Sequence, residues 1–346
     1  MLPYFFILFI VMLVVFVEKY SINRRAFLLP SFFLILFAAV RSEEVGADTK
    51  NYTLNFNIYS SIDYYNFNDG IEWGYKLIEY FILYFTKNYF WLFFTFSCII
   101  VLSYLYVLRK YSLNYSISIF TFICFGYYTF FFNGLRQGVA MAIASLSLIF
   151  LVNKEILKYL ILILIASLFH KSALILIPFY FLVHLNINFL YKAFFVFLGS
   201  FVLSPLIIKI ISLSNERYAS YSLESENSGG FLTLIFYFLI GFFSYFIVFN
   251  KNKNEILFNK IFQLYSLGVI FLIPIALLGA SASGPQRLLF YFSWLSCLII
   301  PYLFIRIKHK PLLFFYGIFC IIYFYLTTTR FSLLVPYSIN DLFRIF

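Results

Sequence analysis

Twelve apolar runs divide the chain, and short polar segments separate them. Most runs approach the roughly 20 apolar residues that a helix needs to cross a bilayer, whereas 26–40, 157–169 and 172–185 are shorter. The pattern predicts an all-α polytopic integral membrane protein with about 12 transmembrane helices, in one transmembrane domain over residues 1–346. The runs are 2–17, 26–40, 89–108, 116–132, 137–152, 157–169, 172–185, 193–213, 231–249, 261–279, 288–305 and 311–327.

The charged residues between the runs fall into two unequal groups. Alternate gaps, six in all, hold 14 of the 25 basic residues but only Glu18, Glu155 and Glu255 among the acidic ones. Short basic loops stay in the cytoplasm, so this face is expected inside and both termini outside. The other face carries 11 of the 14 carboxylates and two long loops, 41–88 and 214–230. We expect the chemistry on that outer face.

Composition narrows the classes of protein further. A chain that is 63% hydrophobic and 11% charged does not fold as a soluble domain. Its net charge of +11 is spread over six loops rather than gathered in one patch, so no nucleic-acid partner is expected. The four cysteines lie within apolar runs and are interpreted as packing residues. With no nucleotide-binding or metal-binding motif, we expect no cofactor and no metal.

The outer segment 41–88 ends in a stretch with helical periodicity. Its apolar face consists of Trp73, Leu77, Tyr80, Phe81 and Tyr84, and its charged face of Glu72, Lys76 and Glu79. Such a stretch is typical of a helix lying in the membrane interface. Two interpretations stay open: a lid that only packs on the bundle, or a helix that contacts substrate.

The charge rule disfavours arginines at or beyond outer helix ends, where six lie: Arg41, Arg136, Arg217, Arg287, Arg330 and Arg344. A structural role is favoured for Arg330 and Arg344, and a functional role for the other four. Guanidinium groups hold phosphate through two parallel hydrogen bonds and keep their charge. Several around one cavity would form an anion site, and a lipid-linked pyrophosphate is the expected outer-leaflet anion. Salt bridges to outer carboxylates, or contacts with lipid phosphate, are the alternative.

Arg136 is the most informative of these arginines. It opens a span just after Asn133, which is placed to cap the first helical turn. A cation at a helix N-terminus opposes the helix dipole, so its position costs stability unless an anion joins it. Gly138 and the alanines that follow allow close packing, which predicts a helix in the core of the bundle.

Three residues are candidates for proton transfer. Among the three histidines, only His170 lies on the outer side, where it could accept a proton from a sugar hydroxyl or donate to phosphate. Asp48 lies in the outer segment that begins at Arg41, and Glu72 adds a carboxylate at the start of the predicted interfacial helix. The structural alternatives are a hydrogen-bonded core histidine, an Arg41–Asp48 ion pair and a helix-start charge at Glu72.

Five short motifs resemble the EpsG/Wzy-type family of O-antigen and exopolysaccharide polymerases, over about residues 25 to 300. They are Arg41 with Val45-Gly46-x-Asp48-x-x-x-Tyr52, Glu72-x-Gly74-Tyr75, Asn133-x-x-Arg136-Gln137-x-x-Ala140, His170-Lys171-Ser172-Ala173-Leu174, and Arg217-Tyr218-x-x-Tyr221. The resemblance implies a GT-C-like bundle with an outer-face interfacial helix, in the bacterial inner membrane with its active site facing outward.

The resemblance also implies a reaction. A growing glycan on undecaprenyl pyrophosphate would be transferred to the hydroxyl of a lipid-linked repeat unit, with a flippase and a chain-length regulator as further partners. The four arginines would bind the pyrophosphate together with Tyr52, Asn133 and Gln137. His170 is favoured as the proton acceptor, then Asp48, then Glu72. The competing functions are a lipid-linked oligosaccharide flippase or transporter, an O-antigen ligase and a membrane O-acyltransferase.

Overall fold

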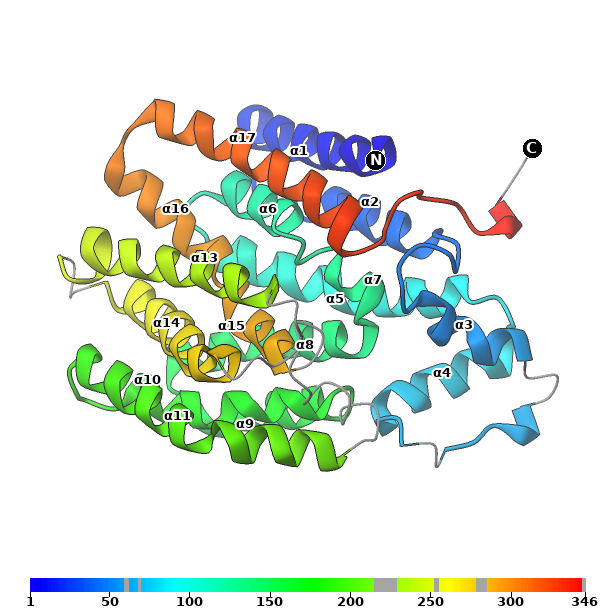
Figure 1. Ribbon diagram of the computed structural model, residues 1–346. Coiled ribbons are helices and arrows are strands. Elements are labelled where there is room, and N and C mark those ends of the chain that lie inside the picture. Colours follow the sequence, from blue (N-terminus) through cyan, green and yellow to red (C-terminus); the bar gives the residue numbers. More distant parts are fainter. Residues whose placement is uncertain (59–61, 68–69, 215–228, 252–254, 278–284, 344–346) are drawn as a thin grey trace. The chain divides into compact units, whose positions relative to one another are not determined.

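The computed structural model describes residues 1–58, 62–67, 70–214, 229–251, 255–277 and 285–343. All regular elements in these ranges are helices, and the only β-type contact recorded there is an isolated bridge between Arg41 and Ile339. The prediction of an all-α protein is therefore confirmed. The chain forms two compact units, Met1–Leu174 with His309–Phe346, and Ile175–Lys308 (Figure 1).

The first unit is built around α5 and α8. Helix α8 packs against α5 and α9, α5 against α2, α2 against α1, and α17 against α6. The elements of this unit are α1 (Leu2–Ile22), α2 (Leu28–Ala39), α3 (Thr49–Ile58), η1 (Ile62–Tyr64), α4 (Trp73–Phe85), α5 (Phe90–Tyr111), α6 (Tyr115–Cys124), α7 (Phe130–Asn133), α8 (Leu135–Asn153), α9 (Ile156–Ser167), α17 (Lys310–Leu326), η6 (Thr327–Phe331) and η7 (Asp341–Phe343), and η2 (Lys171–Leu176) leads to the second unit.

The second unit is centred on α14, which packs against α11, α13 and α10. Pro274 lies inside α14, in its last turn. The elements are α10 (Ile177–His184), α11 (Phe189–Ser214), α13 (Gly229–Ser244), η4 (Tyr245–Phe249), α14 (Ile256–Leu277), η5 (Pro285–Leu289), α15 (Phe290–Ser293) and α16 (Ser296–Ile307).

Every apolar run of the sequence contains helix in the described residues. Within the part of the chain that the structure describes, six helices are long and apolar enough to cross a membrane, a bent pair over 287–307 makes a seventh, and five further apolar helices are shorter. A total of twelve crossings remains a prediction. The expected continuous span 116–132 is wrong, because α6 ends at Cys124 and the chain turns at Gly126, whose φ of +79° suits a glycine.

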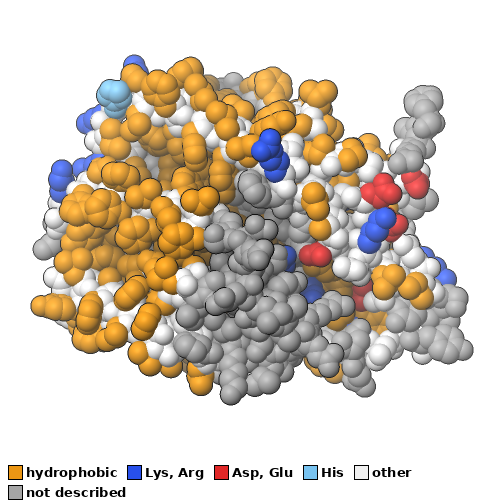
Figure 2. Space-filling model, viewed as in Figure 1, with side chains coloured by type: hydrophobic (Ala, Val, Ile, Leu, Met, Phe, Trp, Pro, Cys, Tyr) orange, Lys and Arg blue, Asp and Glu red, His pale blue; other side chains and the backbone are white. Residues whose placement is uncertain are grey.

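Segments that are distant in sequence meet at the two ends of the first unit. At one end, the amide of Asn340 donates to the carbonyl of Val40 (2.8 Å), and the Asn133 side chain donates to the carbonyl of Ser332 (2.6 Å). At the other end, Arg25 donates to the carbonyl of Arg109. We call the former the polar end of the unit. Acidic side chains on the face shown in Figure 2 gather there, over α3, α4 and the C-terminal segment.

Helix α4 has the amphipathic character that the sequence predicts. Trp73, Leu77 and Phe81 are each more than 60% exposed, whereas Lys76 and Glu79 are each 1% exposed. The charged face therefore points into the protein and the apolar face points outward. An outward apolar face is stable in lipid and unstable in water, which supports a position in the membrane interface.

Glu79 gives a prediction about stability. Burial raises the pKa of this carboxyl above its ordinary value of 4.5. Hydrogen bonds from Tyr65 (2.5 Å) and Asn55 (3.0 Å) lower the pKa, but the effect of burial is larger. The folded state therefore binds this proton more tightly than the unfolded chain, and its stability falls as pH rises from 4.5 through the raised pKa. Glu79→Gln is expected to remove that decline.

The measurement is the thermal unfolding midpoint of the purified protein in detergent, recorded between pH 4.5 and 8. The difference between Glu79→Gln and the wild type should grow in favour of the variant as pH rises. Glu44→Gln, at an exposed carboxyl, serves as the control for a lost surface charge. A constant difference across this range would contradict the assignment.

Candidate functional site

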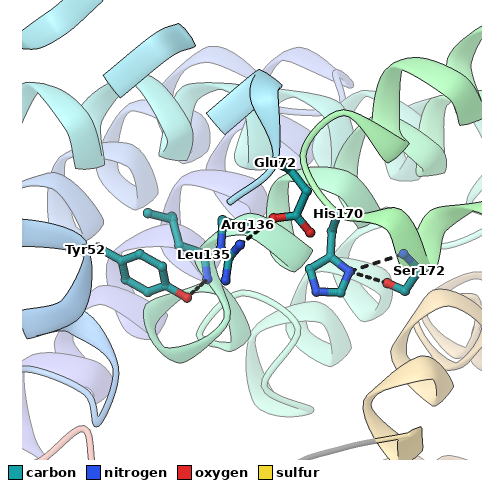
Figure 3. Close-up of polar contacts among 6 residues, drawn as sticks. All are labelled: Tyr52, Glu72, Leu135, Arg136, His170 and Ser172. Carbon is teal, nitrogen blue, oxygen red and sulfur yellow. Dashed lines mark hydrogen bonds and ion pairs between the residues drawn. The ribbon is translucent and has the colours of Figure 1, made fainter. Parts of the chain in front are cut away.

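Three separate helices bring together a cation, a carboxylate and an imidazole at the polar end of the first unit. Arg136 lies in the first turn of α8, Glu72 immediately precedes α4, and His170 follows α9. The Arg136 guanidinium forms an ion pair with the Glu72 carboxylate, and their side chains are 24% and 13% exposed. Figure 3 shows the carboxylate directed toward both the guanidinium and the His170 ring. We call these three residues the Arg136 cluster.

A glycine fixes the position of Glu72. The amide of Gly74 donates to the carbonyl of Leu168 (2.8 Å), which ties the start of α4 to the end of α9. A Cβ atom at position 74 would lie 2.8 Å from that carbonyl oxygen. Only glycine permits this approach, which places Glu72 beside the turn that carries His170.

Gly74→Ala is therefore expected to push α4 away from α9 and displace Glu72. Overpacking of this kind costs about 1–3 kcal/mol, and loss of the cluster geometry should also lower activity. Gly317→Ala on α17 is the matched control, because a Cβ there meets nothing within 4 Å. Thermal unfolding and the activity assay described below check the pair, and equal behaviour of the two variants would contradict the role of Gly74.

The predicted cap of α8 is wrong. Asn133 does not cap the helix, because its side-chain nitrogen donates to the carbonyl of Ser332 (2.6 Å) and Gly134 is the residue at the cap position. The first amide of α8, at Leu135, donates instead to the hydroxyl of Tyr52 (3.1 Å), a residue of α3 (Figure 3). Tyr52 thus joins α3 to the start of α8.

The position of Arg136 matches the prediction for a cation at a helix start. Such a residue opposes the helix dipole, and in this structure the Glu72 carboxylate supplies the compensating anion. Arginine has five N–H donors, so one guanidinium can contact more than one acceptor. Gly138 allows the close packing predicted for α8, since a Cβ there would lie 2.5 Å from the Cβ of Phe131.

His170 is held by a neighbour in sequence. Its Nδ1 lies 2.5 Å from the Ser172 hydroxyl and 3.4 Å from the Ser172 amide nitrogen. The surrounding turn is fixed by backbone bonds from the His170 amide to Ala166 (3.2 Å) and from the Ala173 amide to His170 (3.1 Å). The imidazole therefore has a defined orientation, half-buried beside the start of α4.

Arg41 lies in a different environment from Arg136. It is 0% exposed, its guanidinium lies 3.9 Å from the Phe93 ring centre and 4.3 Å from that of Phe132, and it donates to the carbonyl of Ala38 (2.5 Å). Burial lowers the pKa of Arg41 to about 10, so it remains a cation at neutral pH. Its Nε and Nη2 have no hydrogen-bond partner within the described residues.

The alternative Arg41–Asp48 ion pair is wrong, because no ion pair joins these two side chains in the described part of the chain. Asp48 is half-buried just before α3, and Gln137 is buried on α8. Arg287 belongs to η5 of the second unit. Arg217 and most of the predicted loop 214–230 lie outside the described residues. Contributions of these four residues to a substrate site stay predictions.

The sequence alone assigns no function to two residues that contribute to the site, Ser172 and Gly74. Both belong to the short motifs, and the structure gives each a contact that orients a residue of the Arg136 cluster. The spacing His-x-Ser was the available signal, since a hydroxyl two residues beyond a histidine reaches its ring in a tight turn.

These observations define a multi-pass membrane protein with several long apolar helices and a half-buried polar cluster at the ends of three of its helices. The chain matches the EpsG family over residues 24–339 and belongs to that family. The family is associated with the polymerisation of polysaccharides. No curated protein and no solved structure matches the chain.

Proposed function

We propose that this protein is a polysaccharide polymerase of the O-antigen type, which works at the outer face of the bacterial inner membrane. The observation that carries the proposal is the Arg136 cluster, in which a guanidinium, a carboxylate and an imidazole converge at the polar end of an EpsG-family membrane protein. The donor is the growing glycan on undecaprenyl pyrophosphate, and the acceptor is a lipid-linked repeat unit.

The reaction needs two kinds of group. The acceptor hydroxyl forms a bond to the anomeric carbon of the donor sugar, the bond from that carbon to the pyrophosphate oxygen breaks, and the hydroxyl proton goes to a base. Charge develops on the departing pyrophosphate, and fixed cationic donors stabilise it. Arg136 supplies that charge in the proposal, with Arg41, Arg217 and Arg287 as further candidates. Tyr52, Asn133 and Gln137 are the candidates for hydrogen bonds to the pyrophosphate. Glu72, His170 or Asp48 takes the proton.

The Arg136–Glu72 pair suits a site that binds and releases an anion. A partly buried ion pair keeps the guanidinium in place before substrate arrives, and an entering pyrophosphate adds a second anion to the same cation. The pyrophosphate would then compete with the Glu72 carboxylate for Arg136 and weaken their ion pair. Glu72 would thereby become available as a base when the substrate is bound.

The experiment that tests this function is the size distribution of surface polysaccharide in a strain deleted for the gene. Collapse of the ladder to core plus one repeat unit, restored by the wild-type gene, would support a polymerase. Loss of even the single unit from the surface would favour a flippase or a ligase instead and would overturn the proposal.

A further inference from the structure

The two contacts of His170 Nδ1 determine where the imidazole carries its proton. A backbone N–H donates and never accepts, so the Ser172 amide, 3.4 Å away, requires a lone pair on Nδ1. The Ser172 hydroxyl lies 2.5 Å from the same ring nitrogen, and it is the donor in the tautomer that keeps this lone pair. In that tautomer a neutral imidazole carries its one hydrogen on Nε2.

We propose that Ser172 is a positioning residue that holds His170 as an Nε2–H donor. The inference rests on the proposed glycosyl transfer and assigns roles within it. His170 donates a hydrogen bond to an oxygen of the departing pyrophosphate, and Glu72 accepts the proton of the attacking hydroxyl. This arrangement replaces the acceptor role that the sequence favours for His170.

The local structure explains why a serine serves here. The turn after α9 places position 172 so that both its amide and its hydroxyl reach the same ring nitrogen. If Nδ1 carried the hydrogen, the ring N–H and the Ser172 N–H would point toward each other and repel. The buried Ala173 anchors the turn and keeps the Ser172 backbone beside the ring. One serine thereby fixes both the tautomer and the direction of Nε2.

The first test reads the tautomer without substrate. Nitrogen NMR of ¹⁵N-histidine-labelled protein in nanodiscs distinguishes Nε2–H from Nδ1–H, and the chain has only three histidines. The signal lost in His170→Gln identifies His170. We expect the Nε2–H form in the wild type and a larger share of the Nδ1–H form in Ser172→Ala, which keeps only the weaker amide contact. An Nδ1–H form in the wild type would overturn the inference.

The second test uses side chains that imitate one ring nitrogen each. The amide nitrogen of glutamine reaches the position of Nε2, whereas that of asparagine reaches only Nδ1. If His170 donates, His170→Asn should lower the rate of polymer formation by about 10²–10³-fold, the usual loss for one such donor, and His170→Gln should lower it far less. Equal losses in the two variants would overturn the donor role.

Ser172 itself is tested in the same assay, which supplies lipid-linked repeat units extracted from the deletion strain. Ser172→Ala should slow the reaction and Ser172→Thr should restore it, because threonine keeps the hydroxyl. Ser167→Ala is the control, since that hydroxyl donates to the carbonyl of Leu164 (2.7 Å) one turn earlier in α9. Wild-type protein that forms no polymer would refute the proposed function, while the tautomer would still decide the inference.

Discussion

Arg136→Ala is expected to abolish polymer formation in cells while the protein still inserts into the membrane. The substitution removes the cation at the start of α8 and leaves Glu72 as a partly buried carboxylate without its partner. Loss of a preorganised charge at a departing group usually costs about 10²–10³ in rate. Weaker binding of the pyrophosphate lowers the rate further. The polysaccharide ladder on the gel should therefore collapse to a single repeat unit.

Arg136→Lys should rescue poorly. A lysine keeps the charge, but it lacks the planar fork of donors with which arginine binds a carboxylate and a phosphate together. Arg330→Ala is the matched control, because Arg330 is an exposed arginine in η6. Membrane content is followed by immunoblot and polymer length by gel. Normal chain lengths in Arg136→Ala cells would refute the role of Arg136 as a clamp.

The sequence was sufficient for the helices but not for their interruptions. Apolar runs follow from the low polarity of the bilayer, so each run contains helix in the described residues. The break between α6 and α7 was missed because Phe125, Tyr127 and Tyr128 keep the run apolar while Gly126 turns the backbone. A hydrophobicity pattern records polarity and does not record a left-handed dihedral angle.

The amphipathic pattern of α4 predicted two faces but not their directions. In a soluble protein the apolar face would be buried, whereas here Leu77 and Phe81 are exposed and Glu79 is buried. The buried carboxylate is stable because Tyr65 and Asn55 donate to it from segments that precede α4. Those partners are distant in sequence, and a helical period contains no information about them.

The candidate site likewise depends on contacts between residues that are distant in sequence. Arg136 was identified from its unfavourable place at a helix start, which is a local property. Its partner Glu72 lies 64 residues away, and the hydroxyl of Tyr52 that replaces Asn133 as the partner of the first α8 amide lies 83 residues away. Capping by Asn133 was a sound local expectation, but the C-terminal segment competes for its side chain. Local sequence permits more than one partner for such a group, and contacts with distant segments determine which partner is used.

Glu72→Gln is expected to lower turnover by about 10²–10⁴-fold, the usual contribution of a general base. Glutamine has nearly the shape of glutamate and keeps a carbonyl oxygen for the Arg136 guanidinium, but it has little basicity. The rate is measured with purified protein in nanodiscs and lipid-linked repeat units from the deletion strain. Glu44→Gln, at an exposed carboxyl of the same end, controls for the lost charge.

Binding of undecaprenyl pyrophosphate should separate Glu72→Gln from Arg136→Ala. Removing the carboxylate deletes the anion that competes for Arg136, so Glu72→Gln should bind the pyrophosphate more tightly while it turns over more slowly. Arg136→Ala should lose both binding and turnover. If Glu72→Gln weakened binding and left turnover intact, Glu72 would only position Arg136, and the base would have to be Asp48 or His170.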